Sequence, residues 1–219
     1  MKVALITDTH FGARNDSLLF LDFFRKFYEN IFFPTLKERG ITDVIHLGDV
    51  VDRRKFINFK TLNSMKEILF HPLEEMGVNT RIIVGNHDIY YKNTLKVNSM
   101  EELTRGMNNI SVYSDPCEVS LTKEHKVLFL PWICADNEDK SKELIEKTRT
   151  KVAFGHLQIA GIESDKGSFM IEGHPIPMFK AFQRVFSGHF HHRSTTGLSL
   201  IHISEPTRLL SISYAVFCL

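Results

Sequence analysis

The stretch Thr80-Arg81-Ile82-Ile83-Val84-Gly85-Asn86-His87-Asp88 decides the fold of this chain. Its first five residues are mostly β-branched and predict a buried strand over residues 80–84. The four residues that follow are a glycine and three polar side chains, so the strand ends by presenting polar groups at one edge of a sheet. A plain turn gives the same local pattern, and the stretch alone therefore indicates only a strand end.

Four further motifs of the same construction follow one another along the chain. Each comes directly after a short apolar run that predicts a strand, over residues 3–7, 44–47, 151–154 and 184–187. The motifs are Asp8-Thr9-His10, Gly48-Asp49, Gly155-His156 and Gly188-His189-Phe190-His191. Taken singly, such a motif is most often a turn with a satisfied polar side chain. Five of them, all after strands, predict one shared site.

The residue types indicate a centre that holds two metal ions. Two divalent ions about 3.5–4 Å apart can clamp the attacking and the leaving oxygen of a phosphoester. A carboxylate such as Asp49 can bridge them, while neutral imidazoles and an Asn carbonyl complete the coordination without excess negative charge. Mixed nitrogen and oxygen ligands favour Mn, Fe, Zn or Co over Ca or Mg. No cysteine belongs to the set, which argues against a structural zinc site.

Strand and helix patterns alternate between the motifs, which predicts an α/β layered fold. Apolar residues at helical spacing predict helices over residues 16–39 and 59–76, each followed by a glycine. Residues 117–122 and 126–131 predict a hairpin, and residues 136–150 a charged, solvated helix. The apolar stripes of the first two helices indicate core packing.

Length and composition fit a single cytoplasmic domain. The 219 residues are enough to bury a substantial core, and the net charge of +1 provides no overall basic field that would attract nucleic acid. Cys117 and Cys134 predict reduced thiols, and the sequence suggests neither a signal peptide nor a membrane span. A local basic patch or a partner would have to supply any contacts to nucleic acid.

The ordered motifs resemble those of the calcineurin-like metallophosphoesterase superfamily. Within it, Asp-Thr-His at the first motif and Gly-Asn-His-Asp at the third resemble the SbcD-type DNA repair exonucleases and the phage recombination endonuclease subunits. Protein phosphatases would instead be expected to carry Gly-Asp-x-His-Gly and Gly-Asn-His-Glu. The resemblance covers residues 1 to about 197. It implies a layered α/β/β/α sandwich that is truncated at its C-terminal end, because relatives continue into a capping region and a segment that docks on an SbcC-type ATPase.

The resemblance also implies a role for each motif residue. The two metals share Asp49; the first also takes Asp8, His10 and His191, and the second takes Asn86, His156 and His189. His87 is implied to contact the scissile phosphate and to assist departure of the leaving oxygen, with Asp88 orienting it. The alternative for His87 is a structural hydrogen bond.

The sequence also suggests roles for charged residues and histidines near the motifs. Arg53, Arg54 and Lys55 form the candidate substrate-binding cluster, although such a run is as often a solvated face. SbcD-type nucleases often have a histidine three residues after the bridging Asp, where this chain has Asp52, and an unpaired carboxylate there would repel a phosphate. His46 is expected to be buried behind the ligands. The remaining histidines are expected on the surface or in loops, with His192 either behind the ligands or facing solvent: His71, His125, His174 and His192.

These inferences predict metal-dependent hydrolysis of DNA, with Mn²⁺ as the expected metal. The activity would be that of an exonuclease, with endonuclease activity as a second expectation, in recombination and repair in a bacterial or phage-infected cell. The helix over residues 59–76 is also a candidate homodimer surface, as it is in relatives. Two alternatives stay open: a phosphatase or small-molecule phosphodiesterase on the same scaffold, and a non-catalytic binding subunit that keeps the ligands for structure.

Residues 198–219 differ in character from the rest of the chain. They resemble the in-frame translation of a sequencing adapter. The two matching segments are separated by three residues, which is the length that a translated index sequence would have. A natural β-rich terminus is the alternative, because residues 199–203 and 212–217 favour strands. We therefore expect a catalytic domain over residues 1–197 and a tail without function, although its β-prone segments can pair with an open sheet edge.

Overall fold

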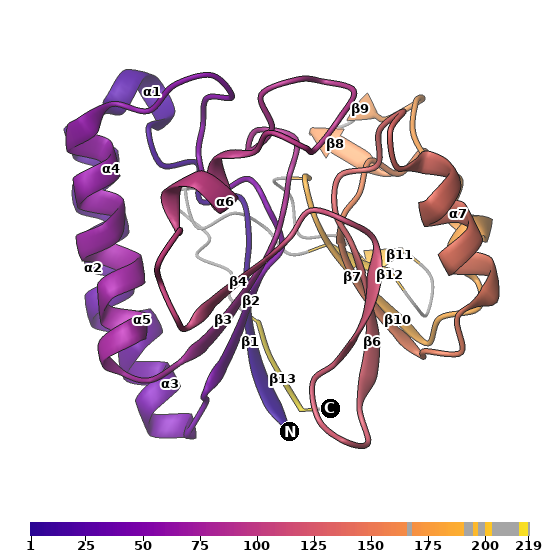
Figure 1. Cartoon of the computed structure of the whole chain (residues 1–219), viewed down its shortest axis with the longest axis horizontal. Helices are drawn as coiled ribbons and strands as arrows, with labels where there is room; N and C mark the ends of the chain where they lie inside the picture. Colours follow the sequence, from indigo (N-terminus) through magenta and orange to yellow (C-terminus); the bar gives the residue numbers. More distant parts are fainter. Residues whose placement is uncertain (166–167, 191–194, 197–199, 203–214, 219) are drawn as a thin grey trace.

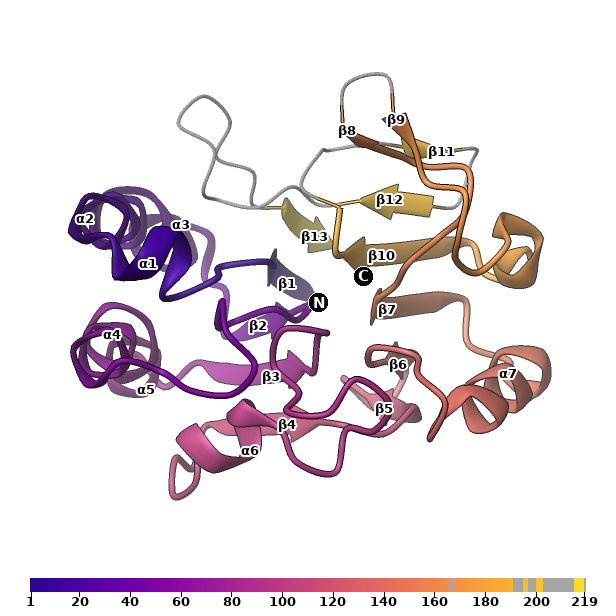
Figure 2. The same cartoon turned by 90° about the horizontal axis from the view of Figure 1, so that it is seen from above.

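The computed structural model describes residues 1–165, 168–190, 195–196, 200–202 and 215–218, and the side-chain surroundings of residues 1–162 and 169–190. Two β-sheets lie face to face, and helices cover the outer face of each (Figures 1 and 2). This arrangement confirms the predicted α/β/β/α sandwich. None of the described helices has the length and apolarity needed to cross a membrane.

The first sheet has the strand order β13-β1-β2-β3-β4. Its parallel strands are β1 (Lys2–Ile6), β2 (Asp43–His46), β3 (Asn79–Ile83) and β4 (Ile110–Tyr113). The first three match the runs predicted from the sequence to within one or two residues. The edge of β1 is occupied by β13 (Ala215–Cys218), which runs antiparallel to it.

The second sheet has the order β11-β12-β10-β7-β6-β5. Its parallel strands are β12 (Leu200–His202), β10 (Arg184–Gly188), β7 (Val152–His156) and β6 (Lys126–Leu130). At its edges lie β5 (Cys117–Ser120), which forms the predicted hairpin with β6, and β11 (Thr195–Thr196). A small separate hairpin joins β8 (Glu163–Asp165) and β9 (Ser168–Phe169). Segments of the tail thus pair with strands of both sheets.

Alternation along the strands builds separate apolar layers. In β1, Val3 and Leu5 belong to the layer between the sheets, whereas Ala4 and Ile6 pack against the helices of the first sheet. Side chains point alternately to the two faces of a strand, so a strand buried on both faces reads as one continuous apolar run. This explains why the sequence shows uninterrupted runs before each motif. The layer between the sheets is also rich in aromatic side chains: Phe129, Phe154 and Phe186.

The two predicted long helices are present, and each contains one widened turn. The first consists of α2 (Leu18–Phe27), the π-helical turn η1 (Tyr28–Phe32) and α3 (Phe33–Arg39). The second consists of α4 (Phe59–Met65), the π-helical turn η2 (Lys66–Phe70) and α5 (His71–Glu75). Pro34 and Pro72 are the second residues after these turns. A proline lacks the N–H donor and crowds the carbonyl four residues earlier, and a π turn accommodates both effects.

The remaining helical segments are short. The predicted charged helix is α7 (Glu138–Lys147), which is shorter than residues 136–150 because the side chain of Asn137 binds the preceding loop and Thr148 is extended. The helix α6 (Ser99–Leu103), which the sequence analysis did not anticipate, is capped by Asn98. The segment η3 (Ile176–Phe179) is a 3₁₀ turn. In α1 (Ala13–Asp16), residues 14–16 have positive φ, so this is a left-handed turn.

Candidate metal centre

The five motifs converge at the carboxyl ends of the central strands of both sheets. Asp8, Asp49 and Asn86 follow β1, β2 and β3 of the first sheet, while His156 and His189 stand at the ends of β7 and β10 of the second. Figure 1 shows these strand ends at the same edge of the molecule. The first two motifs are joined by backbone hydrogen bonds, in which Asp8 donates to Gly48 O (3.0 Å) and His10 donates to Asp49 O (3.0 Å).

Strained backbone turns set the direction in which the candidate ligand side chains point. Four site residues that are not glycine have positive φ: Asp8, His10, Asp49 and His189. Such a conformation costs roughly 1–3 kcal/mol per residue and persists only where the surroundings impose it. Gly48 has a φ of 104°, and a Cβ atom there would lie 2.6 Å from His156 Nδ1 and 2.9 Å from Gly85 Cα. Glycine is therefore required where motifs two, three and four pack together.

Asp49 lies at the centre of the cluster. It belongs to two groups of potential ligands whose donor atoms all lie within 4.8 Å of one another; one group contains His10 and His87, the other His156 and His189. Burial alone would raise the pKa of Asp49, but the surrounding histidines, His156 first, lower it well below its usual range. Asp49 is therefore an ionised carboxylate shared by two adjacent groups, as a bridge between two metals requires.

The second group fits a divalent ion in the chemistry of its donors. His156 Nδ1 donates to Leu47 O (2.8 Å), and its Nε2 faces Asn86 Oδ1 at 2.9 Å and Asp49 Oδ2 at 3.3 Å. His189 Nδ1 lies 3.0 Å from the same Asn86 oxygen. Acceptor atoms that face one another need a cation between them, and burial fixes the donors in place. Although burial lowers the pKa of His156, Asp49 and Asp8 raise it to about 9, so this group attracts positive charge.

The first group is built around His10. Its Nε2 atom lies 3.9 Å from Asp8 Oδ1 and 3.8 Å from Asp49 Oδ2, and all three side chains are almost fully buried. The carboxylate of Asp8 also accepts hydrogen bonds from the Thr7 hydroxyl and from the backbone of His189. Of the seven ligands predicted from the sequence, the structure brings six together, and His191 lies outside the described residues.

The expected contact between Asp88 and the His87 ring is wrong. His87 Nδ1 instead donates to the backbone carbonyl of Asp52 at 2.5 Å. The buried carboxylate of Asp88 accepts from four backbone N–H groups, which belong to Asp49, Val50, Val51 and Gly85. A carboxylate with two oxygens can accept several N–H donors at once, and this one closes the loop that carries Asp49 onto motif three. Asp88 thus positions the loops of the site and does not orient His87.

His46 lies behind the ligands, as expected from the sequence. It accepts from the Gly48 N–H through Nδ1 (3.2 Å), so its Nε2 donates to the Thr9 hydroxyl (3.1 Å), which in turn donates to Val50 O (3.1 Å). Burial lowers the pKa of His46 to about 3, which keeps the ring neutral. This chain of hydrogen bonds ties motif one to motif two beneath the metal ligands.

The basic cluster does not act as one surface. The Arg53 guanidinium donates to Asp16 Oδ2 (2.8 Å) and to Asn15 Oδ1 (3.2 Å), and so holds the left-handed turn of α1. The role of Arg53 in substrate binding stays a prediction. Arg54 is half-buried and Lys55 is exposed. Among the described residues, the ion pair recorded for Asp52 is with His10, at 3.9 Å, and not with the basic cluster.

Trp132 is a site residue that the sequence analysis missed. Its ring centroid lies 5.0 Å from that of His189 and 6.0 Å from that of His156, and its backbone N–H donates to Val84 O. It is the only tryptophan of the chain and directly follows the predicted strand over residues 126–131. The sequence signal was therefore its position at the same strand ends as the other motifs.

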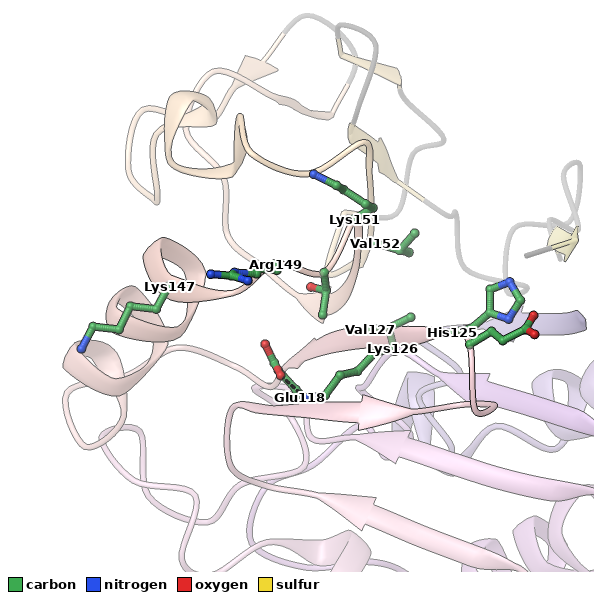
Figure 3. A pocket seen from close by; sticks show the side chains of 10 residues that line it. Glu118, His125, Lys126, Val127, Lys147, Arg149, Lys151 and Val152 are labelled. Atoms are coloured by element: carbon green, nitrogen blue, oxygen red, sulfur yellow. Dashed lines mark ion pairs between the residues drawn. The ribbon is translucent and has the colours of Figure 1, made fainter.

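A hollow of about 610 Å³ lies apart from this centre (Figure 3). It is formed at the amino ends of β6 and β7, opposite to the ends that carry the ligands. Its lining includes the paired Glu118 and Lys126 together with Arg149 and Lys151. Of the histidines without a predicted role, His125 lies in this lining, His71 is exposed and His174 is half-buried.

The chain belongs to the calcineurin-like phosphoesterase family, whose sequence profile matches residues 1–193. Proteins of this family use a dimetal centre, and the residues described above are candidate ligands for one. A curated relative, "Exonuclease subunit 1" of Enterobacteria phage T4, is 31% identical over 195 residues. That alignment covers 87% of this chain and 55% of the relative, so the chain spans about half of the relative's length.

A solved structure supports the fold. A dimetal phosphatase from Danio rerio aligns with a TM-score of 0.58, over 99% of this chain and 91% of its own, at 12% sequence identity. At this identity the similarity shows a shared fold and nothing about the substrate.

Proposed function

We propose that this chain hydrolyses phosphodiester bonds of DNA in a two-metal reaction, as an exonuclease that also has endonuclease activity. The observation that carries the proposal is the position of Asp49, which is shared by two groups of potential ligands, one with His10 and His87 and the other with His156 and His189. We assign His87 to the substrate and not to a metal, and a site that holds two ions next to such a histidine is suited to splitting a phosphoester. The similarity to an exonuclease subunit supports DNA as the substrate.

The residues of the chain would divide the work as follows. Two divalent ions, when bound, supply a nucleophile from water near neutral pH and stabilise the charge that develops on the phosphate. Asp49 would hold both ions, and Asn86, His156 and His189 would hold the second. Because His87 Nδ1 donates to the Asp52 carbonyl, Nε2 is the atom left to meet the substrate. As an imidazolium, His87 would donate the Nε2 proton to the leaving oxygen.

Two alternative functions would require different features of the site. A phosphatase or small-molecule phosphodiesterase would use the same ligands, so only substrates separate it from the nuclease. A non-catalytic binding subunit has no need for His87, and the hydrogen bond that fixes this ring beside the ligands favours an enzyme.

Substrate assays separate the nuclease from the phosphatase. The purified chain, loaded with Mn²⁺, is incubated in parallel with an end-labelled DNA duplex and with p-nitrophenyl phosphate. We expect nucleotides to be released from the duplex in a reaction that EDTA stops, with little release of p-nitrophenol. The matched control is Asp49→Asn, which removes the shared charge and should be inactive. Rapid hydrolysis of p-nitrophenyl phosphate without degradation of DNA would establish the phosphatase instead.

The identity of the metal, the partner, the cellular role and the oligomeric state are further parts of this proposal. Mn²⁺ suits the mixed nitrogen and oxygen donors, with Fe, Zn or Co as the other metals that fit. The relative is named as a subunit, which supports assembly with an SbcC-type ATPase. We also propose a role in DNA recombination and repair in the cytoplasm, where Cys117 and Cys134 would stay reduced. Homodimerisation through the helix predicted over residues 59–76 is part of this proposal.

A further inference from the structure

A second hollow lies beside the metal centre. It measures about 200 Å³ and lies between the loop that follows motif two and the segment that follows motif three. Its lining includes Arg54, Lys55, Phe56, Tyr90, Val97 and Leu103. The two loops are joined at the centre itself, because His87 donates to the carbonyl of Asp52. A molecule with a phosphate at the metals could therefore extend directly into this hollow.

The walls of the hollow are anchored to the site. The Tyr90 N–H donates to Val97 O (3.0 Å), which closes the loop between them. Ser99 donates to the Asp88 carbonyl through both its N–H and its hydroxyl. Since the Asp88 carboxylate in turn binds the Asp49 loop, the hollow is held at a fixed place relative to the metal ligands.

Arg54 points to an anionic ligand. Its Nη1 atom is buried, and no described residue accepts a hydrogen bond from it. The neighbouring Arg53 is engaged by Asp16, so the two arginines differ in what they can still bind. Glu102 also lines the hollow, but its carboxylate already accepts two hydrogen bonds from Arg105 (3.0 and 3.1 Å). A planar guanidinium with free donors suits a phosphate group, which can accept two of them.

Exposed aromatic rings lie on the two loops that form the hollow. Phe56, Tyr90 and Tyr91 are 65%, 38% and 52% exposed, which is high for large rings on neighbouring loops. Lys55 Nζ lies 5.5 Å from the centroid of the Tyr90 ring, and the rings of Tyr90 and Tyr91 are 4.7 Å apart. Basic and aromatic side chains that alternate along one path are how proteins bind single-stranded nucleic acid, with the rings stacking on bases and the cations contacting the backbone.

We infer that this hollow binds the nucleotide next to the scissile phosphate of a single-stranded DNA end. Arg54 would bind the phosphate of that nucleotide, and Tyr90 would stack on its base. The inference rests on the proposed function and adds to it that the strand must be unpaired at the site, because a base within a duplex has no free face for Tyr90. Recognition would be independent of sequence, since every base presents an aromatic face.

Binding of a labelled oligonucleotide tests the subsite. The full chain is titrated against a fluorescein-labelled single-stranded oligonucleotide in EDTA, so that nothing is cleaved, and anisotropy reports affinity. We expect Tyr90→Ala to weaken binding roughly fivefold to a hundredfold, and Tyr90→Phe, which keeps the ring, to restore affinity to within about twofold. Arg54→Gln should weaken binding and lower the slope of log affinity against log salt by about 0.7, the value for one phosphate contact on a single strand.

Controls separate this inference from the proposed function. Arg25 is on the exposed side of α2 in an ion pair with Glu29, and Arg25→Ala should bind like the wild type. If the wild-type chain neither binds the oligonucleotide nor degrades DNA, the proposed function fails. If the wild type does both, but Tyr90→Ala and Arg54→Gln bind as tightly with an unchanged salt slope, the subsite alone is refuted. In that case the aromatic surface would be assigned to a protein partner.

Discussion

Asp88→Asn tests whether one carboxylate holds the site loops together. Asp88 Oδ1 accepts from Val50 and Val51, and Oδ2 accepts from Asp49 and Gly85, at 2.9–3.2 Å. Whichever oxygen becomes the amide nitrogen, two buried N–H groups lose their acceptor and face another donor. Each unpaired donor costs about 1–3 kcal/mol, so the loss is about 2–6 kcal/mol. The asparagine no longer buries a charge, which offsets part of this loss, and we expect a net destabilisation of about 2–4 kcal/mol.

Urea unfolding followed by circular dichroism measures this loss. The experiment is done in EDTA, because bound metal would add its own stabilisation and conceal the effect of the loop. The control is Asp115→Asn, whose carboxylate is exposed and pairs only across the surface with Lys140 at 3.5 Å. That change should stay within about 0.5 kcal/mol. A loss below about 1 kcal/mol for Asp88→Asn would refute the view that its four hydrogen bonds hold the loops.

Four further predictions follow from the same structure. His87→Ala should abolish hydrolysis and leave the metal content per chain unchanged; loss of one ion, measured by mass spectrometry, would make His87 a ligand. Tyr28→Phe should stabilise the protein by about 1–2 kcal/mol, because the buried Tyr28 hydroxyl has no described partner, whereas the exposed Tyr91→Phe should change little in the same urea titration. Co²⁺ should quench the fluorescence of Trp132, which lies against His189, and EDTA should restore it; an unquenched signal would place the metal elsewhere. Deletion of residues 198–219 should leave metal affinity unchanged and reduce aggregation measured by light scattering, and a loss of metal would show that the tail supplies a ligand.

The strand ends were predictable because parallel strands place their carboxyl ends at one edge of a sheet. Asp8, Asn86 and His156 could therefore be gathered from three separate apolar runs before any coordinates were known. The widened turns in the long helices could not be recognised from apolar spacing, which continues through them. Only Pro34 and Pro72 marked their positions.

The partners of charged side chains were harder to predict. Asp88 was expected to bind its neighbour His87, but its acceptors are used by backbone groups that lie 37 to 39 residues earlier and by Gly85. The pairing of Arg53 with Asp16 depends on a left-handed turn that no local sequence pattern announces. Such contacts arise from how loops pack in three dimensions. A sequence motif can identify a functional residue, but it does not show which group that residue contacts.

The division of the ligands between the two sheets has a consequence for folding. Asp49 belongs to one sheet, and His156 and His189 belong to the other, so this group of ligands can hold its ion only when the sheets are docked. The free energy of metal binding is then available to the docked state alone, so metal binding stabilises the docked arrangement of the two sheets. The temperature of unfolding should therefore rise with metal concentration. Chelation should reduce the cooperativity with which the halves melt, leaving them joined mainly by the aromatic layer between the sheets.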